Sequence, residues 1–85
     1  MKVVCVIGVG LIGGSFSKDI QAHYPGVKRI GIDTNDHYLV EALKLGVIDE
    51  IGHLEDVAQA DLVFIAIPVD ATLKILPQVL DLVAD

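Results

Sequence analysis

Runs of apolar residues alternate along the chain with segments in which apolar positions recur every three or four residues. The continuous run Val3–Ile7 is typical of a strand buried on both faces of a sheet. Ile12, Phe16 and Ile20 follow at helical spacing, which predicts a helix with these side chains on its buried face. Residues 24–26, Tyr-Pro-Gly, predict the end of that helix because proline and glycine together favour a turn.

The same alternation continues to the end of the chain. Residues 29–33 and 62–67 predict two further strands, and residues 47–51 predict a short strand between them. Thr34-Asn35-Asp36 offers N-cap side chains for a second helix. Gly46 stands where a glycine would close that helix.

Two expectations concern the faces and ends of the later helices. The apolar face of the second helix is expected to consist of Leu39, Val40 and Leu43. Asp70 is expected to cap a last helix, and Pro77 falls inside its apolar pattern. Because proline cannot donate a backbone hydrogen bond, we expect this helix to kink or restart there.

Strands that alternate with helices predict an α/β fold with a parallel sheet and right-handed crossovers. Residues 1–85 are expected to form a partial Rossmann-type doubly wound domain, containing its first four strands in the order 3-2-1-4. The fifth and sixth strands of that arrangement are absent, so the fourth strand would lie at an open edge. We therefore expect the chain to be the N-terminal part of a longer protein.

Composition excludes several classes of protein. Of the 85 residues, 32 are Val, Ile or Leu and only 5% are aromatic, which excludes disorder and predicts an aliphatic core. The net charge is −6 with no cluster of cations, so nucleic acid is not an expected partner. The apolar opening run is too short for a membrane helix, so no membrane association is expected. The single cysteine, Cys5, predicts a reduced thiol in the cytoplasm.

The candidate chemistry lies in residues 8–13, Gly-Val-Gly-Leu-Ile-Gly, between the first strand and the first helix. Gly8 allows a tight turn, Gly10 lets the backbone approach a pyrophosphate, and Gly13 allows the helix to pack closely on the strand. Leu11 and Ile12 open the helix, whose free N–H groups can hold the diphosphate without a basic side chain. A G-x-G-x-x-G match alone is weak, and a purely structural turn is the alternative.

Asp33 ends the second strand 20 positions after Gly13, the spacing at which a carboxylate meets the adenosine ribose of a dinucleotide. A carboxylate accepts hydrogen bonds from both ribose hydroxyls and repels a 2′-phosphate, and the adjoining Thr34 supplies no cation. NAD is therefore the expected cofactor rather than NADP. The alternative is that Asp33 only caps the next helix.

No metal site is expected. The three histidines, His23, His37 and His53, share no metal-ligand spacing, and Cys5 adds no ligand pair. His53 falls in a predicted loop, where a solvated histidine is the common case.

With these motifs together, the chain resembles the N-terminal cofactor domain of prephenate or arogenate dehydrogenases. The matching segments are residues 6–15 (Val-Ile-Gly-Val-Gly-Leu-Ile-Gly-Gly-Ser), 31–33 (Gly-Ile-Asp), 46–49 (Gly-Val-Ile-Asp) and 60–69. The doubled glycine followed by serine, and Gly-Val-Ile-Asp, are more specific than the glycine pattern alone. The resemblance covers nearly the whole chain but only the cofactor half of the family's architecture.

The resemblance implies that the complete enzyme oxidatively decarboxylates prephenate to 4-hydroxyphenylpyruvate with NAD, in tyrosine biosynthesis. It also implies that Pro68 and Val69 line the ribose and nicotinamide side of the cofactor. The family's catalytic histidine and arginine, and its helical domain that forms a homodimer, lie beyond the equivalent of residue 85. No catalytic residue is therefore expected in this chain, which is predicted to bind the dinucleotide and to be inactive alone.

Other dehydrogenases share such an N-terminal half, among them β-hydroxyacid dehydrogenases and pyrroline-carboxylate reductases. Gly14-Ser15 and the segment that begins at Gly46 argue against them. A second alternative is a regulatory module that senses NAD without reacting with it. A methyltransferase-like or flavin-binding Rossmann variant ranks last.

Overall fold

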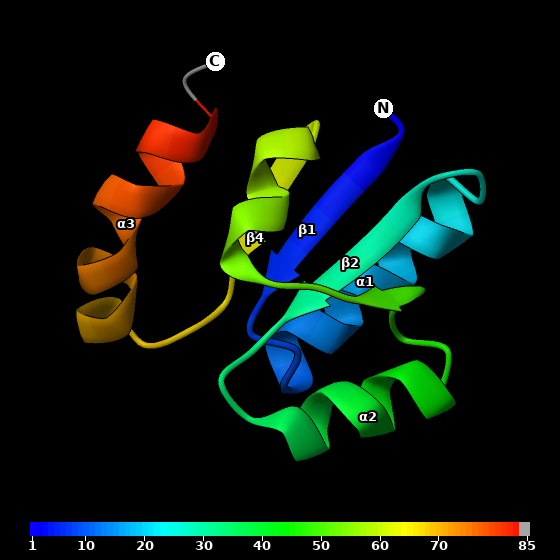
Figure 1. The fold of residues 1–85 in the computed structure, drawn as a ribbon. Helices are drawn as coiled ribbons and strands as arrows, with labels where there is room; N and C mark the ends of the chain where they lie inside the picture. The colour runs from blue at the N-terminus through cyan, green and yellow to red at the C-terminus, as the bar shows by residue number, and fades with distance from the viewer. Residues whose placement is uncertain (84–85) are drawn as a thin grey trace.

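A four-stranded parallel sheet with helices on both faces forms the molecule in a computed structural model, which describes residues 1–83 (Figure 1). The strands are β1 (Val3–Ile7), β2 (Lys28–Ile32), β3 (Glu50–Ile51) and β4 (Leu62–Ile65). They lie in the order β3-β2-β1-β4, and every pair is parallel. This order confirms the predicted partial Rossmann topology, with β4 at one edge of the described sheet.

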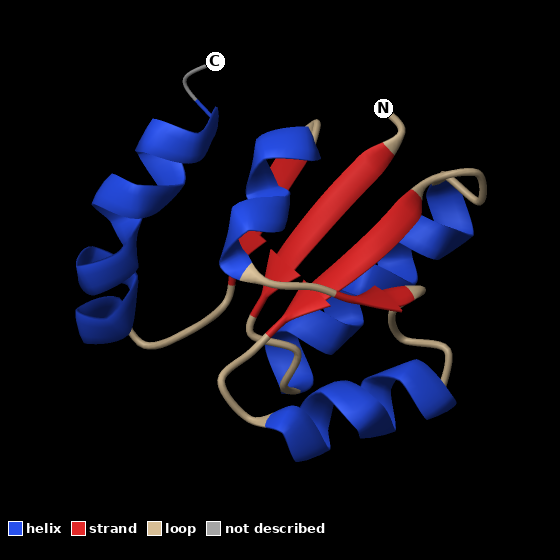
Figure 2. Ribbon diagram, viewed as in Figure 1, coloured by secondary structure: helices blue, strands red, loops and turns tan. Residues whose placement is uncertain are grey.

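Two layers of helix cover the sheet (Figure 2). Helices α1 (Leu11–His23) and α2 (Asp36–Lys44) lie on one face. The 3₁₀ helix η1 (Leu54–Gln59) and helix α3 (Val69–Val83) lie on the other. Because the strands are parallel, their carboxyl ends meet at one edge of the sheet, where β1 leads into α1 and β2 leads into α2.

The core is aliphatic, as the composition predicted. Strand β1 contributes to both sides, with Val4 and Val6 packed toward α1 and α2, and Cys5 and Ile7 packed toward η1 and α3. The Cys5 side chain is fully buried, and this burial raises the pKa of its thiol to about 11. At neutral pH the thiol is therefore protonated and unreactive.

Helix α1 presents a different face to the sheet from the one predicted. Gly13, Ser17 and Ile20 are buried and Phe16 is partly buried, whereas Ile12 is 71% exposed. The close approach of the helix to the strand brings Gly13 inward, which turns its neighbour Ile12 away from the sheet. The placement of Ile12 on the buried face was wrong.

Helix α2 begins and ends as predicted, but its buried face differs. The Asn35 side chain caps it by accepting a hydrogen bond from the Tyr38 N–H at 3.2 Å. Gly46 has a φ of +72° and closes the helix, with its N–H donating to the Leu43 carbonyl. The buried residues are Leu39 and Ala42, whereas Val40 is 44% and Leu43 is 42% exposed. The small Ala42 side chain allows the helix to lie close to the sheet.

Two of the later strands are shorter than expected. β3 consists of Glu50–Ile51 rather than residues 47–51, because the N–H groups of Val47 and Ile48 both donate to the Ala42 carbonyl at the end of α2. β4 ends at Ile65 rather than at residue 67, although the Ala66 N–H still donates to the Ile7 carbonyl at 2.7 Å.

Helix α3 begins earlier than predicted and is continuous through Pro77. It begins at Val69, so Asp70 lies in the first turn rather than at the cap. Its carboxylate is still placed favourably there with respect to the helix dipole. The helix runs through Pro77 without a restart. The carbonyl that loses its partner belongs to Leu73, which is 64% exposed, so water can replace the missing N–H.

Among the described residues one charged side chain is buried, and it joins three elements. Arg29 on β2 is 1% exposed, and its guanidinium donates to both carboxylate oxygens of Asp49 at 3.0 and 3.1 Å. It also donates to the carbonyls of Val47 at 2.8 Å, Gly46 at 3.1 Å and Ser17 at 3.4 Å. We call this arrangement the arginine clamp. It joins α1, β2 and the connection from α2 to β3.

Among residues 1–83, no helix is both long and apolar enough to span a bilayer. The same residues bring no three His, Cys, Asp or Glu side chains together in a way that would hold a metal ion.

Candidate functional site

The glycine loop begins directly after β1, at the carboxyl edge of the sheet. Gly8 has a φ of +92°, a conformation that side chains other than glycine rarely adopt. A Cβ atom at this position would lie 2.6 Å from the carbonyl oxygen of Ala66, so no larger residue fits. The Gly8 N–H donates to the Ile32 carbonyl at 2.7 Å, which fixes the loop against the end of β2.

The other two glycines of the pattern lie in opposite environments. A Cβ atom at Gly13 would overlap the carbonyl oxygen of Gly8, so glycine is required where α1 crosses the end of β1. A Cβ atom at Gly10 would have no other atom within 4 Å. Gly10 is also the N-cap of α1 and no side chain caps the helix there. Open space therefore lies beside the first N–H groups of α1.

The carboxylate of Asp33 reaches the glycine loop from the end of β2. Its Oδ2 atom accepts a hydrogen bond from the Val9 N–H at 3.1 Å, and its Oδ1 atom accepts one from the Asn35 N–H at 2.9 Å. Each carboxylate oxygen can accept two hydrogen bonds, so each keeps capacity for a further donor. The carboxylate thus has a fixed position and unused acceptor capacity.

A cleft of about 580 Å³ opens between the glycine loop, the end of β2 and the start of α3. It lies at the carboxyl edge of the sheet, where nucleotide sites of open α/β sheets are found. Its walls include Gly8, Gly10 and Asp33, and the lining contains no lysine or arginine. Asp33 is the only carboxylate among the lining residues. Because the lining contains no lysine or arginine, a phosphate here would be held by backbone N–H groups.

The structure brings together five of the nine cofactor-binding residues predicted from the sequence. The five that line the cleft are Gly8, Gly10, Asp33, Thr34 and Pro68. The other four lie around it. Leu11 and Ile12 form the first turn of α1 and are 89% and 71% exposed, Gly13 lies beneath the loop, and Val69 is 74% exposed at the start of α3.

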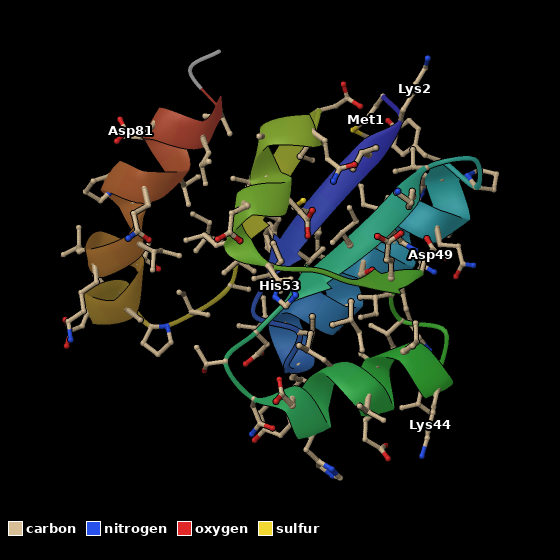
Figure 3. All side chains as sticks on the ribbon, in the orientation of Figure 1. Met1, Lys2, Lys44, Asp49, His53 and Asp81 are labelled. Carbon is tan, nitrogen blue, oxygen red and sulfur yellow. The ribbon has the colours of Figure 1, made fainter. Side chains whose placement is uncertain are left out.

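The remaining wall of the cleft was not predicted as a binding surface. It is formed by residues from α2, from the segment after β3, and from α3: Tyr38, Gly52, His53, Leu54, Ala71 and Ile75, among others. His53, interpreted from the sequence as a solvated loop residue, is exposed but belongs to this wall. Figure 3 shows His53 and Asp49 at opposite ends of β3. No local motif marks these residues, because only the fold brings their segments together.

The parallel sheet, the glycine loop at the carboxyl end of β1 and the carboxylate at the end of β2 define a Rossmann-type nucleotide-binding domain. Residues 16–85 match the family described as prephenate dehydrogenase, nucleotide-binding domain. The chain belongs to this family, and the resemblance found in the sequence is confirmed.

Two curated relatives are prephenate dehydrogenases. The protein from Bacillus subtilis (strain 168) is 44% identical over 77 residues, which cover 88% of this chain and 21% of that protein. The protein from Lactococcus lactis subsp. cremoris (strain MG1363) is 36% identical over 80 residues, which cover 93% of this chain and 22% of that protein. The chain thus spans about a fifth of the length of these relatives.

Two solved structures share the fold. Prephenate dehydrogenase from A. aeolicus, solved in complex with hydroxyphenyl propionate and NAD⁺, has a TM-score of 0.80 and 32% identity over 94% of this chain and 29% of that one. Synechocystis arogenate dehydrogenase has a TM-score of 0.81 and 27% identity over 95% of this chain and 28% of that one. These findings favour the prephenate dehydrogenase prediction over the other dehydrogenases and over the sensor module.

Proposed function

We propose that the chain binds NAD in the cleft at the carboxyl edge of the sheet. The diphosphate would rest on the N–H groups of the glycine loop and the first turn of α1, beside the open space at Gly10. The adenosine ribose would use the free acceptor capacity of Asp33. The observation that carries this proposal is the convergence of Gly8, Gly10 and Asp33 on one cleft.

Preference for NAD over NADP follows from the charge of the cleft. The 2′-phosphate of NADP would lie near the Asp33 carboxylate, and the lining residues provide no cation to offset the repulsion. Thr34, the next residue along the chain, is neutral and also lines the cleft. The A. aeolicus relative, which binds NAD⁺, supports the same choice of cofactor.

The complete protein would be a prephenate dehydrogenase that converts prephenate, or arogenate, in tyrosine biosynthesis. NAD supplies the hydride acceptor for this oxidation when it is bound. This chain's residues would bind and orient the cofactor, with Pro68 on the wall of the cleft and Val69 at the start of α3. The relatives are about four times as long as this chain, which supports a further catalytic and dimer-forming helical domain that carries the histidine and arginine. We propose a cytoplasmic location for the protein and no activity for residues 1–85 alone.

Calorimetric titration of the purified chain with NAD and with NADP tests the binding proposal. NAD is expected to bind at least about tenfold more tightly, which corresponds to about 1.4 kcal/mol of discrimination. The absence of NAD binding, or tighter binding of NADP, would contradict it.

Two glycine substitutions separate binding from folding. Gly10→Val places a branched side chain in the open space where the diphosphate is proposed to lie, so NAD affinity should fall while the melting temperature stays the same. Gly14→Ala is the matched control one turn into α1, where the added Cβ would lie at an ordinary 3.4 Å from Val47 and should leave binding unchanged. Normal NAD binding by the Gly10→Val variant would show that the loop is only structural.

A further inference from the structure

Val9, between the first two glycines of the loop, is held from two sides. Its side chain is 7% exposed and packs in the core above Gly31, where an added Cβ would lie 2.9 Å from the Val9 Cγ1 atom. Its backbone N–H donates to the Asp33 carboxylate. The loop is therefore attached to β2 by an apolar contact, and to Asp33, the residue that follows the strand, by a hydrogen bond.

The carboxylate that accepts this bond is itself held in place. Asp33 Oδ1 accepts the Asn35 N–H, and the Asn35 side chain accepts the Tyr38 N–H at the start of α2. A continuous chain of hydrogen bonds thus runs from the glycine loop through Asp33 to the first turn of α2. None of these bonds requires a bound ligand.

The loop needs such a support because the two glycines beside Val9 restrict the backbone little. Gly8 and Gly10 flank Val9, and a backbone flanked by glycines has more conformations available than any other. The Gly10 backbone has no neighbouring side chain to restrict it on its open side. A bond that fixes the Val9 peptide also fixes the direction of the N–H groups that follow it.

We propose that Asp33 is a positioning residue for the glycine loop as well as a sugar ligand, so that it prepares the diphosphate-binding N–H groups before any nucleotide is present. The part of this inference that concerns diphosphate rests on the proposed function. If Asp33 acted only on the sugar, a neutral replacement would affect a ligand without a sugar only through the lost negative charge. If Asp33 positions the loop, a neutral replacement that cannot accept the Val9 N–H binds inorganic diphosphate more weakly than one that can.

A charge-matched pair of variants isolates this effect. Asp33→Ala and Asp33→Asn remove the same negative charge, but the asparagine keeps one oxygen that can accept the Val9 N–H. Titration with inorganic diphosphate should show weaker binding by Asp33→Ala than by Asp33→Asn, by several-fold. Equal affinities of the two variants would overturn the proposal, because only the charge would then matter.

Amide hydrogen exchange of the chain without ligand gives an independent measurement. Exchange at the Val9 N–H should be slowest in the unsubstituted protein, faster in Asp33→Asn and fastest, by about tenfold or more, in Asp33→Ala. The Gly8 N–H, which donates to the Ile32 carbonyl instead, is the internal reference. Unchanged exchange at Val9, or an equal increase at Gly8, would overturn the proposal.

The two measurements also separate this inference from the proposed function. Failure of the chain to bind NAD would remove the proposed function, whereas the order of Val9 exchange rates would still support the positioning role of Asp33. Conversely, NAD binding together with a Val9 exchange rate that is the same in the Asp33 variants as in the unsubstituted protein would leave the proposed function standing. That result would remove the positioning role.

Discussion

Two aspartates hold the two ends of β2, and their surroundings differ in one respect. Asp49 comes just before β3 in the chain and contacts Arg29 near the start of β2. It accepts the Arg29 N–H at 2.9 Å and pairs with the Arg29 guanidinium. Asp33, just after the end of β2, accepts two backbone N–H groups and has no cation among its hydrogen-bond partners. Both carboxylates join distant segments of the chain.

The difference suits one aspartate to the framework and the other to the proposed binding site. The Asp49 charge is neutralised by the buried guanidinium, and Arg29 holds the pKa of the Asp49 carboxyl below its ordinary value. The Asp33 carboxylate faces a cleft without an internal counter-charge, so its charge and part of its acceptor capacity remain for a ligand. An aspartate paired with a cation is thus suited to structure alone, whereas one held by neutral backbone N–H groups keeps its charge for the proposed ligand.

Removing the buried cation should have the largest effect on stability. Arg29→Met removes the guanidinium donor from the carbonyls of Val47, Gly46 and Ser17. The Ser17 hydroxyl, which also donates to the Val47 carbonyl, then remains as a hydrogen bond between α1 and the connection that follows α2. Loss of partners for buried polar groups costs about 1–3 kcal/mol each, so we expect a loss of about 3–5 kcal/mol in the free energy of unfolding. Urea denaturation followed by circular dichroism measures it.

The neighbouring residue provides the control for this prediction. Lys28 also lies on β2 and pairs with Glu50 at 3.4 Å, but both side chains are about half exposed. Lys28→Met should therefore change the free energy of unfolding by less than about 1 kcal/mol. A similar loss for Lys28→Met and Arg29→Met would show that the clamp contributes no more than a surface ion pair.

The pH dependence of the free energy of unfolding should show the contribution of the Asp49 carboxylate to the arginine clamp. Because the pKa of Asp49 is lowered by folding, its contribution is present above the ordinary value of 3.8 and is lost as the pH falls through the lowered value. Asp49→Asn should reduce stability at pH 7 by about 1–2 kcal/mol, after allowance for screening of the half-exposed carboxylate. The difference from the unsubstituted protein should shrink as the pH falls below the ordinary value of 3.8 and through the lowered pKa, as measured by urea titrations at several pH values. A constant difference at every pH would contradict the assignment.

The topology could be predicted from the sequence because it depends on local patterns. The buried run at Val3–Ile7, the glycine at Gly46 and the spacing between Gly13 and Asp33 each follow from short-range rules. The inward face of α1 could not be predicted, since it depends on how closely the helix approaches the Gly8 carbonyl. Ile12 fits the helical pattern and is nevertheless exposed.

The candidate site could be predicted only in part, for the same reason. The glycines and Asp33 belong to a motif with fixed spacing, whereas Tyr38, His53 and Ile75 reach the cleft from three separate segments. The Arg29 clamp was also not predicted, because an arginine on a strand gives no sign of burial until its four acceptor residues are brought around it. Contacts between polar groups that are far apart in the sequence follow no local pattern, so they could not be predicted from the sequence alone.

Changing the charge just after β2, at Asp33 and Thr34, should have the smallest effect in free energy. The quantity affected is the preference for NAD over NADP. Asp33→Ser combined with Thr34→Arg removes the repulsion of a 2′-phosphate and adds a cation on the wall of the cleft. The ratio of NAD to NADP affinity should narrow or reverse, by about fivefold to tenfold, which is about 1 kcal/mol. The NAD affinity should also fall, because serine does not replace the carboxylate that holds the Val9 N–H. Calorimetric titration with both dinucleotides measures the ratio, and an unchanged ratio would show that Asp33, like Asp49, serves only the framework.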